Sequence, residues 1–398
     1  MRIVLFWVDF LHYHVARIQA ASQLAIQEGH EVFPIAVRSG APQFPVPGYQ
    51  NLLSGPLYVL SDNPQSGDMQ SSLAARRMVA ALQEIEPNVV AIAGYDTRVA
   101  LASLGWCRRN KRGAILMTES QQHDFSRQAW KEQIKRKLIG QFDSALVGGK
   151  PHAAYLVSLG MPHQRIFQGY DVVDNEFWGE WASQVHVEAQ SWRQRLNLPE
   201  RFFLAACRLV DKKNVTGLLQ AYAHYVTKEP VSWPLVIVGD GPLRSELESL
   251  TQSLGVAQQV HFLGYLSADQ MGPVYGLASV FILASAYSEQ WGLVVNEAMA
   301  AGLPVFVSQI CGCVPDLVLD GVTGYAFDPT DKYALADLLA QSSRGELNLN
   351  QLGQAAQHHI QAFSPQLFAE NLLASAEAAV THAQKRRINI WPFPLVLP

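Results

Sequence analysis

The sequence predicts an α/β protein built from two successive domains, each with a parallel sheet. Short apolar runs alternate with helix-compatible segments along most of the chain, an order typical of βαβ units. The length of 398 residues leaves room for two to three domains of about 150 residues each. Hydrophobic residues make up 49% and charged residues 16%, which suits large cores and excludes an intrinsically disordered chain. We therefore expect two Rossmann-like domains that face each other across a cleft, with ligands at the carboxyl ends of the strands.

The N-terminal part carries the first series of strands and helices. Apolar runs bounded by turn residues predict its strands, over residues 2–8, 31–37, 88–94, 113–120 and 144–149. A helix is expected to end at Gly29. The segment 39–67 is rich in Pro and Gly, which predicts a long loop interrupted by a short strand near 57–60.

A second series follows a polar, tryptophan-containing stretch over residues 171–195. Its predicted strands are residues 202–210, 234–241, 260–264, 278–285 and 303–308. No motif of the first series is repeated in identical form in the second. Two α/β arrays in succession are the simplest architecture that accounts for this order.

Charge and cysteine content exclude several classes of function. The 30 Lys and Arg residues against 34 Asp and Glu residues give a net charge of −4, which disfavours a nucleic-acid partner. The N-terminus lacks the apolar core of a signal peptide, and no stretch reaches the ~18 apolar residues of a membrane span. The C-G-C at 311–313 is too tight for the usual zinc spacings, and Cys107 and Cys207 belong to no C-x-x-C pair. These features favour a cytoplasmic protein with buried, reduced thiols over a metal or redox protein.

The most informative motif is SEQWGLVVNEAMAAGLPVFVS, residues 288–308. Glu289 precedes a predicted helix, Gly292 and Leu293 open it, and Glu297 lies inside it. The unpaired N–H groups and positive dipole end of such a helix form a site for a phosphate. The alternative is an ordinary N-terminal carboxylate and a solvated glutamate within the helix.

Cations for a phosphate site occur in CRLVDKKN, residues 207–214. A strand is expected to end at Arg208, and Lys213 follows in the next loop, a combination suited to two adjacent phosphates. Lys212 is interpreted as a solvated turn residue. In the later motif VIVGDGPLRSEL, Gly239 follows a strand, but Arg244 occupies the third glycine position of a dinucleotide fingerprint, which disfavours NAD or FAD.

Five motifs occur in a fixed order: RLVDKKN, LVIVGDGPLRSELESL, VHFLGYLS, SEQWGLVVNEAMAAGLPV and DGVTGYAFDPTD. Together they resemble the motifs of retaining glycosyltransferase family 4, also called group 1. This family has the GT-B fold. The resemblance implies that Arg208 and Lys213 neutralise the diphosphate of a nucleotide-sugar donor. Glu289 would face the donor sugar and Glu297 the ribose. The remaining donor-binding residues that it implies are Gly239, Leu263, Gly264, Gly292 and Leu293, through backbone contacts to the base and the distal phosphate.

The resemblance also implies an activity. The activity is metal-independent transfer of a sugar from a nucleotide-diphosphate sugar to a hydroxyl acceptor, with retention of configuration. A UDP-sugar is the favoured donor and a GDP-sugar the second choice. The acceptor would be a glycan, a lipid-linked glycoside or a small-molecule glycoside. No D-x-D motif is present, and neither a cofactor nor a metal is expected. The alternatives are a nucleotide-sugar epimerase or hydrolase of the same fold, and a non-catalytic nucleotide-sugar-binding subunit.

The family resemblance divides the chain into an acceptor-binding domain over 1–172, a nucleotide-sugar domain over 173–364, and a helix and tail over 365–398 that return to the first domain. The first domain lacks the Gly-Gly turn of many relatives, and Glu119 stands near the position of the family's histidine. Glu119 and His123 are therefore candidate catalytic residues. The candidates for contacting the acceptor are His12, His14, Asp96, Asp124 and Arg127.

A basic amphipathic segment covers residues 127–142 of the first domain. It has Trp130, Ile134 and Leu138 at helical spacing among several cations. Such a helix suits the anionic inner face of a membrane or an acidic acceptor. The alternative is an ordinary outer helix that packs its apolar stripe on the sheet.

Overall fold

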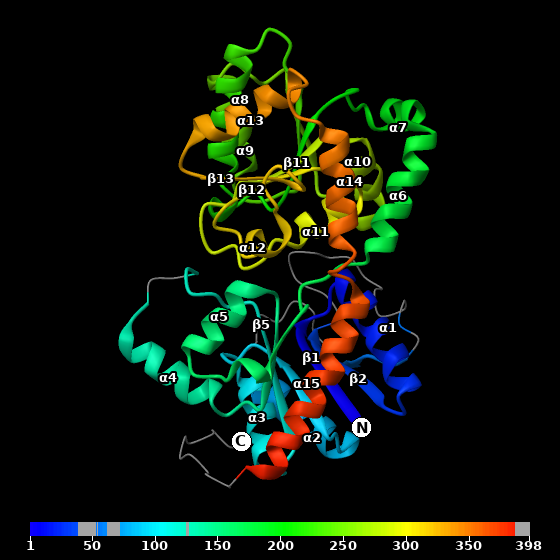
Figure 1. Ribbon diagram of the computed structural model, residues 1–398, viewed down its shortest axis with the longest axis vertical. Coiled ribbons are helices and arrows are strands. Elements are labelled where there is room, and N and C mark those ends of the chain that lie inside the picture. The colour runs from blue at the N-terminus through cyan, green and yellow to red at the C-terminus, as the bar shows by residue number, and fades with distance from the viewer. Residues whose placement is uncertain (39–52, 54, 62–71, 125–126, 387–398) are drawn as a thin grey trace. The chain divides into compact units, whose positions relative to one another are not determined.

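The computed structural model describes residues 1–38, 53, 55–61, 72–124 and 127–386 (Figure 1). Contacts divide the chain into two compact units. Unit 1 contains the N-terminal part up to Val173 together with the chain from Phe363 onward. Unit 2 contains Asp174–Ala362 and also takes in His123 and Asp124, which the sequence had assigned to the first domain. The predicted loop over 39–67 lies largely outside the described residues.

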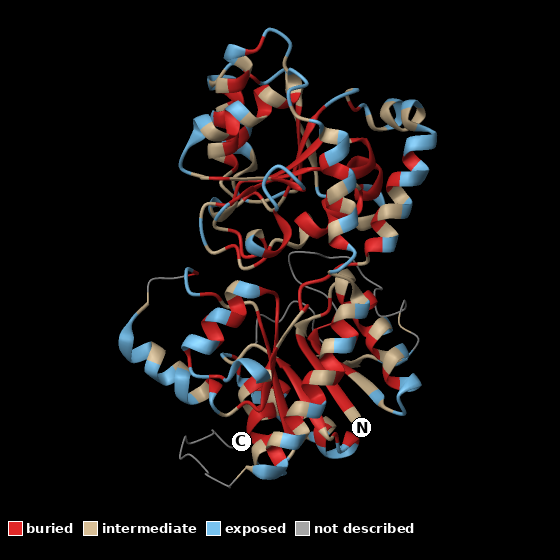
Figure 2. Cartoon of the chain, viewed as in Figure 1, coloured by how far each residue is buried: buried red, intermediate tan, exposed pale blue. Residues whose placement is uncertain are grey.

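Unit 1 is built on a parallel sheet with the strand order β3-β2-β1-β4-β5-β6-β7. Its strands are β1 (Arg2–Asp9), β2 (Glu31–Arg38), β3 (Tyr58–Val59), β4 (Val89–Ala93), β5 (Gly113–Thr118), β6 (Ser144–Val147) and β7 (Ile166–Gln168). The apolar runs of the central strands are buried on both faces, as parallel strands covered by helices require (Figure 2). The sequence had not predicted β7, because its three residues carry too short an apolar pattern.

Helices cover both faces of this sheet. They are α1 (His12–Gln27), α2 (Ser72–Ile85), α3 (Arg98–Arg109), α4 (Ala129–Ile139), α5 (Lys150–Ser158) and α15 (Pro365–Lys385). One core cluster joins the sheet to apolar residues of α2, α3 and α5, and a second joins it to α1 and α15. The last helix of the chain, α15, lies beside α1 (Figure 1).

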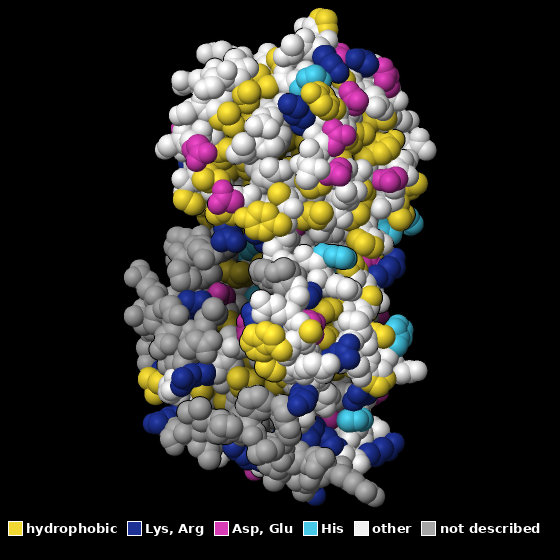
Figure 3. Space-filling model, turned by 90° about the vertical axis from the view of Figure 1, so that its left-hand side faces the viewer, with side chains coloured by type: hydrophobic (Ala, Val, Ile, Leu, Met, Phe, Trp, Pro, Cys, Tyr) yellow, Lys and Arg dark blue, Asp and Glu magenta, His cyan; other side chains and the backbone are white. Residues whose placement is uncertain are grey.

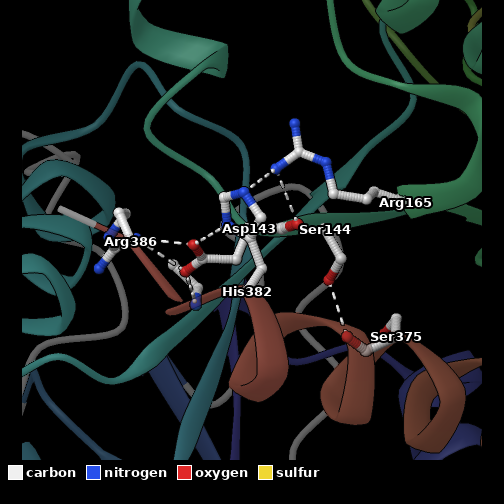
Figure 4. Close-up of polar contacts among 7 residues, drawn as sticks. Asp143, Ser144, Arg165, Ser375, His382 and Arg386 are labelled. Carbon is white, nitrogen blue, oxygen red and sulfur yellow. Dashed lines mark hydrogen bonds and ion pairs between the residues drawn. The ribbon is translucent and has the colours of Figure 1, made fainter. Parts of the chain in front are cut away.

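A polar cluster fixes α15 on the sheet (Figure 4). Asp143, at the start of β6, has no exposed surface, and its Oδ1 lies 2.8 Å from Nδ1 of His382. Arg386 donates to the same carboxylate at 2.7 Å. Ser144 donates from Oγ to the carbonyl oxygen of Ser375 at 2.8 Å. These bonds join residues more than half the chain apart, so that α15 is an integral part of unit 1.

Helix α4 differs from the others in unit 1 because most of its surface is exposed (Figure 2). Trp130 is 62% exposed and Ile134 is 44% exposed. The alternative that the apolar stripe packs on the sheet is therefore wrong for Trp130 and Ile134, whereas Leu138 packs against the core. The inward face of α4 is occupied instead by Glu132 and Lys135, which bind the hydroxyl of Tyr155.

Unit 2 repeats the topology with the strand order β10-β9-β8-β11-β12-β13, again parallel. Its strands are β8 (Phe203–Ala206), β9 (Leu235–Val238), β10 (Val260–Gly264), β11 (Val280–Leu283), β12 (Val305–Ser308) and β13 (Gly324–Phe327). Strand β8 ends before Arg208, the residue at which the sequence placed its end. The chain turns there, since the carbonyl of Arg208 accepts from the N–H of Val210 at 3.0 Å.

The helices of unit 2 surround this second sheet. They are α6 (Asn175–Val187), α7 (Ala189–Leu196), α8 (Val215–Lys228), α9 (Arg244–Ser253), α10 (Ala268–Leu277), α11 (Leu293–Ala300), α12 (Val314–Leu317), α13 (Lys332–Ser343) and α14 (Leu349–Ile360). The strand order reverses between β1 and β4 in unit 1 and between β8 and β11 in unit 2. This pattern confirms the prediction of two Rossmann-like domains. In the part of the chain that the structure describes, no helix is both long and apolar enough to span a bilayer.

Candidate functional site in unit 2

The loops that follow β8 and β11 meet at the point where the strand order of unit 2 reverses. In doubly wound sheets this edge is where ligands bind. The first loop ends in a 3₁₀ turn over Asp211–Lys213, and the carbonyl of Lys212 accepts from the N–H of Ala286 at 2.9 Å. Asn214, in the left-handed conformation, donates to the carbonyl of Ala284 at 3.2 Å and caps α8 by accepting from Gly217 N. The two loops are therefore held together by backbone bonds and by one cap residue.

Glu289 lies at the centre of these loops and is 6% exposed. Its carboxylate accepts a hydrogen bond from Ser285 Oγ at 2.7 Å and forms an ion pair with Lys213. Burial alone would raise the pKa of Glu289. The charges of Lys213 and Lys212 and the hydrogen bonds from Lys213 and Ser285 outweigh burial, so that the pKa lies below its ordinary value. The carboxylate is therefore ionised at neutral pH.

Lys212 is part of this cluster, which corrects its interpretation as a solvated turn residue. Its Nζ lies 3.5 Å from Oε1 of Glu289 and donates to the carbonyl of Ser288 at 3.1 Å. The error arose because only the tertiary fold brings residue 289 against the loop after β8. Two ammonium groups on one carboxylate leave the cluster with a net positive charge.

Arg208 lies half-buried two residues beyond β8. Burial raises the pKa of the neighbouring Cys207 thiol to about 11, against the opposing charges of Lys213 and Arg208. The guanidinium thus adds a third cation to the same edge of the sheet. Positive charge in excess of the one carboxylate, Glu289, suits a bound anion.

Helix α11 begins beside this cluster. Gly292 has a φ of +102°, and a Cβ built on it would lie 2.8 Å from Leu283 and 3.8 Å from Cγ of Glu289. The preceding Trp291 is 1% exposed and donates from its indole nitrogen to Asn296 Oδ1 at 2.8 Å, which fixes the turn into the helix. The N-cap residue Gly292 has no side chain to accept from the first N–H groups of α11. These N–H groups therefore belong to the candidate site, as expected for Gly292 and Leu293.

Glu297 lies farther along α11 and is 7% exposed. The hydroxyl of Tyr275, from α10, donates to its Oε2 at 2.9 Å. Burial and the charge of Glu297 raise the pKa of Tyr275 well above its ordinary value, so that the hydroxyl keeps its proton. Tyr275 fixes the orientation of the carboxylate. No sequence pattern indicates this contact, because Tyr275 lies in an apolar stretch of another helix.

The ends of β8, β9 and β10 form a backbone-lined edge. Gly239, with a φ of +126°, donates from its N–H to the carbonyl of Gly264 at 2.7 Å. A Cβ on Gly239 would lie 1.9 Å from the carbonyl oxygen of Cys207, so no other residue fits. The pairing of β10 with β9 shifts register between Phe262 and Gly264, at Leu263. Gly239, Leu263 and Gly264 are thus adjacent, and contact there would be made mainly by backbone atoms.

The corresponding edge of unit 1 holds a buried carboxyl pair. Glu119, half-buried directly after β5, lies near Asp171, which is 1% exposed. Burial, followed by the charge of Glu119, raises the pKa of Asp171 well above its ordinary value, against the opposing charge of Arg17. Arg17 Nη2 lies 3.8 Å from Asp171 Oδ1. Asp171 therefore favours its protonated form. Sequence reasoning missed Asp171 and Arg17, which lie 154 positions apart (171 − 17).

His14 and His12 occupy different surroundings at the start of α1. His14 is 4% exposed, its Nδ1 accepts from the N–H of Leu11 at 3.0 Å, and its ring stacks on Trp7. Burial lowers the pKa of His14 well below its ordinary value, so the ring is neutral. These contacts fit a role in starting α1 better than contact with an acceptor. His12 is partly exposed, with its ring edge-on to Tyr13.

The other candidates of the first domain are not gathered into one group. Arg127 donates to the carbonyls of Gln121 and Gln122 and lies over the ring of Tyr155, so it stabilises its own loop. Asp96 is exposed in the loop after β4. Asp124 is 6% exposed, and His123 is exposed. Among the residues that the structure describes, no group of three or more His, Cys, Asp and Glu side chains could hold a metal ion.

Comparison with known proteins finds a family model that matches much of unit 2. Residues 187–359 match the model of the family "Glycosyl transferases group 1". The D-inositol 3-phosphate glycosyltransferase of Corynebacterium diphtheriae is 35% identical over 170 residues, 42% of this chain and 39% of that protein. The GDP-mannose-dependent alpha-(1-6)-phosphatidylinositol monomannoside mannosyltransferase of Mycolicibacterium smegmatis is 33% identical over 177 residues, 42% of this chain and 45% of that protein. The chain thus spans less than half the length of these relatives.

Solved structures extend the likeness of the fold to most of the chain. Anabaena HepE in complex with UDP and glucose has a TM-score of 0.72 and 17% identity, over 94% of this chain and 98% of that one. Sucrose-phosphate synthase from Thermosynechococcus elongatus has a TM-score of 0.70 and 19% identity, over 94% and 97%. These likenesses confirm the expected GT-B fold.

Proposed function

Because residues 187–359 of this chain match the model of the group 1 glycosyltransferases, we propose that the protein transfers a sugar from a nucleotide-diphosphate donor to a hydroxyl acceptor. The observation that carries the proposal is the contact of Lys213 and Lys212 with Glu289 beside the uncapped start of α11. This arrangement combines an excess of cations, helix N–H groups and one ionised carboxylate at the ligand-binding edge of a doubly wound sheet.

In this proposal the diphosphate pairs with the cations that now contact Glu289. Arg208, Lys213 and the first N–H groups of α11 would neutralise the charge that develops on the leaving phosphate. These groups are already held in position by Asn214 and Trp291, so little reorganisation is needed when charge builds up. Glu289 then faces the donor sugar and accepts hydrogen bonds from its hydroxyls.

The nucleoside is assigned to the other end of the site. Glu297, oriented by Tyr275, would accept hydrogen bonds from the ribose hydroxyls. Gly239, Leu263 and Gly264 would border the base, with readout by backbone groups. We favour a UDP-sugar donor, supported by the UDP complex of HepE, and a GDP-sugar next, supported by the GDP-mannose-dependent relative.

The acceptor is assigned to unit 1, with Glu119 as the first candidate for contacting it. Glu119 lies near the buried Asp171, and its carboxylate would accept a hydrogen bond from a sugar hydroxyl. Glu119 thereby replaces the histidine of related enzymes. His123, which is exposed, is the second candidate for that role.

We further propose that the transfer proceeds with retention of anomeric configuration and without a metal ion. The leaving phosphate would assist deprotonation of the acceptor hydroxyl on the same face of the sugar. The cations of the donor site supply the charge that a divalent ion supplies in other transferases.

The test is an activity screen with UDP-, GDP- and ADP-sugars and with glycan, lipid-linked and small-molecule acceptors, in the presence and absence of EDTA. We expect turnover that depends on the acceptor, survives EDTA and yields a product whose anomeric configuration, determined by NMR, matches the donor. Release of free sugar that no acceptor changes would establish a hydrolase instead. Nucleotide binding without any turnover would establish a non-catalytic subunit.

Variants of Glu119 separate the acceptor side from the donor side. Glu119→Gln should raise the KM for acceptor or lower kcat while leaving the Kd for the nucleotide unchanged. Glu119→His should restore part of the lost rate, since it supplies the residue type of the relatives. His123→Ala is the matched comparison, and a larger loss there than in Glu119→Gln would transfer the assignment to His123.

A further inference from the structure

The inward face of helix α4 carries polar side chains that make contacts within unit 1. Glu132 accepts from the hydroxyl of Tyr155 at 2.9 Å, and Lys135 Nζ lies 3.1 Å from that hydroxyl and 3.1 Å from Glu132 Oε1. Ile139 is fully buried. These residues lie three and four positions apart and therefore share one face of the helix. Glu132, the acidic side chain of α4, is thus paired with Tyr155 and Lys135 of unit 1.

The opposite face of α4 carries large apolar side chains in solvent. Trp130 is 62% exposed and Ile134 is 44% exposed, and their spacing of four residues puts them side by side. Lys137, three positions beyond Ile134, continues the same face and is also exposed. Soluble helices ordinarily bury such a stripe, so its exposure indicates an interaction surface.

The flanks of this face are basic. Lys131 and Arg136 are exposed on either side of the apolar stripe, and Lys131 Nζ lies 5.5 Å from the centre of the Trp130 ring. With Lys137 they give the exposed surface of α4 three positive charges and no negative one. In Figure 3, which views the side on which α4 lies in Figure 1, Lys and Arg side chains surround exposed hydrophobic ones on unit 1.

From this arrangement we infer that the outer face of α4 (Trp130, Lys131, Ile134, Arg136 and Lys137) docks on an anionic lipid surface. Trp130 and Ile134 enter the boundary between headgroups and acyl chains, and the cations pair with lipid phosphates. Tryptophan suits this boundary because its ring is apolar and its N–H is polar. A second copy of the chain fits less well, since it would bring the same three positive charges to the interface.

The experiment is a vesicle sedimentation assay with the full chain, without donor or acceptor, so that it does not depend on the proposed activity. Vesicles of phosphatidylcholine alone are compared with vesicles containing about one third phosphatidylglycerol. We expect binding to the anionic vesicles that is at least about tenfold stronger and that falls as salt is raised. Equal binding to both vesicles, or none to either, would overturn the inference.

Two sets of variants locate the surface. The double variant Trp130→Ala/Ile134→Ser keeps every charge and should weaken binding to anionic vesicles at least about tenfold, since the apolar contribution is lost. Its control is Ile26→Ser, which removes a hydrophobic side chain that is 73% exposed on α1 and should change nothing. Circular dichroism of each variant checks that the fold is kept.

The second set removes charge. Lys131→Gln, Arg136→Gln and Lys137→Gln together should weaken binding about fivefold per cation. The matched control neutralises three exposed cations elsewhere, Arg76, Arg109 and Lys228, and should have a much smaller effect. Undiminished vesicle binding in both α4 variants would overturn the inference. So would an α4 variant that only shifts a dimer to a monomer in sedimentation velocity, because the partner would then be a second copy.

Discussion

The ammonium group of Lys213 donates a hydrogen bond to the carboxylate of Glu289, although the two residues lie 76 positions apart. Lys213 follows β8 and Glu289 follows β11, the two neighbouring strands at which the order of the sheet reverses. The pair is anchored on one side by Asn214 and on the other by Ser285. A bound diphosphate would draw Lys213 away from Glu289 and leave the carboxylate to a sugar hydroxyl.

Removing Lys213 should mainly affect the chemical step. In Lys213→Ala we expect kcat to fall about 10²–10³-fold, the usual loss when one preorganised group is removed from a developing charge. The measurement is the initial rate of sugar transfer together with the Kd of the nucleotide. The control is Lys228→Ala, which removes an exposed lysine at the end of α8. Equal rates in Lys213→Ala and the control would remove Lys213 from the donor site.

Glu289 should make the stability of unit 2 depend on pH in a defined direction. Its pKa in the folded protein lies below the ordinary value of 4.5, so its ion pair stabilises the fold fully above about that pH. The contribution is lost as the pH falls through the lowered pKa. Glu289→Gln should therefore reduce the free energy of unfolding by about 1.5–3 kcal/mol at neutral pH, with the difference shrinking toward pH 3.

Denaturant unfolding from pH 8 to pH 3 measures this difference. The control is Glu346→Gln, whose side chain is 52% exposed and whose ion pair with Arg344 is on the surface. It should change the free energy of unfolding by less than about 1 kcal/mol at any pH. If the wild type exceeded Glu289→Gln in free energy of unfolding by more at acid pH than at neutral pH, the ion pair of Glu289 could not be the cause.

Gly292 should not tolerate a side chain. Its left-handed φ of +102° is unfavourable for alanine, and the added Cβ would lie 2.8 Å from Leu283. We expect Gly292→Ala to destabilise unit 2 by more than about 1 kcal/mol and to weaken nucleotide binding. The control is Gly255→Ala, at a φ of +72° with no atom within 4 Å of the new Cβ. If both variants bind nucleotide as the wild type does, the start of α11 is not part of the site.

Asp143 should be essential for holding α15 on unit 1. The carboxylate has no exposed surface and accepts hydrogen bonds from Arg386 and from the N–H of Ala114. Asp143→Ala leaves the arginine without its buried partner, a change that costs about 3–5 kcal/mol. Denaturant unfolding and limited proteolysis within α15 are the measurements. Glu377→Ala, exposed on the same helix, is the control, and an equal effect of the two variants would show that the cluster holds nothing in place.

Local sequence patterns predicted the strands well where these are central and fully apolar. The runs at 89–93, 235–238 and 305–308 contain little but aliphatic and aromatic residues and lie between turn residues, so their burial follows from composition. The end of β8 was misplaced because the chain turns at Arg208, although the sequence stays apolar at Leu209 and Val210. Strand β7 was missed because its pairing with β6 defines it more than its own three residues do.

The candidate site shows the same division. Motif spacing was enough to propose Glu289, Gly292, Glu297, Arg208 and Lys213, because each lies after a strand or in the helix that follows it. Ser285, Lys212 and Tyr275 were missed or misread, since their contacts with the two glutamates depend on how loops and helices from different βα units pack. The outward orientation of Trp130 likewise depends on Tyr155, which pairs with the polar face of α4.

By itself, the sequence determined the alternation of strands and helices, the two-domain organisation and the residue types at the strand ends, because these follow from local periodicity and turn chemistry. Only the tertiary structure decided which charges meet. The reversal of strand order places the loops after β8 and β11 side by side, and the charges of two lysines then keep the buried Glu289 ionised at neutral pH. Electrostatic interactions act over a few ångströms in space, and distance along the chain does not measure them.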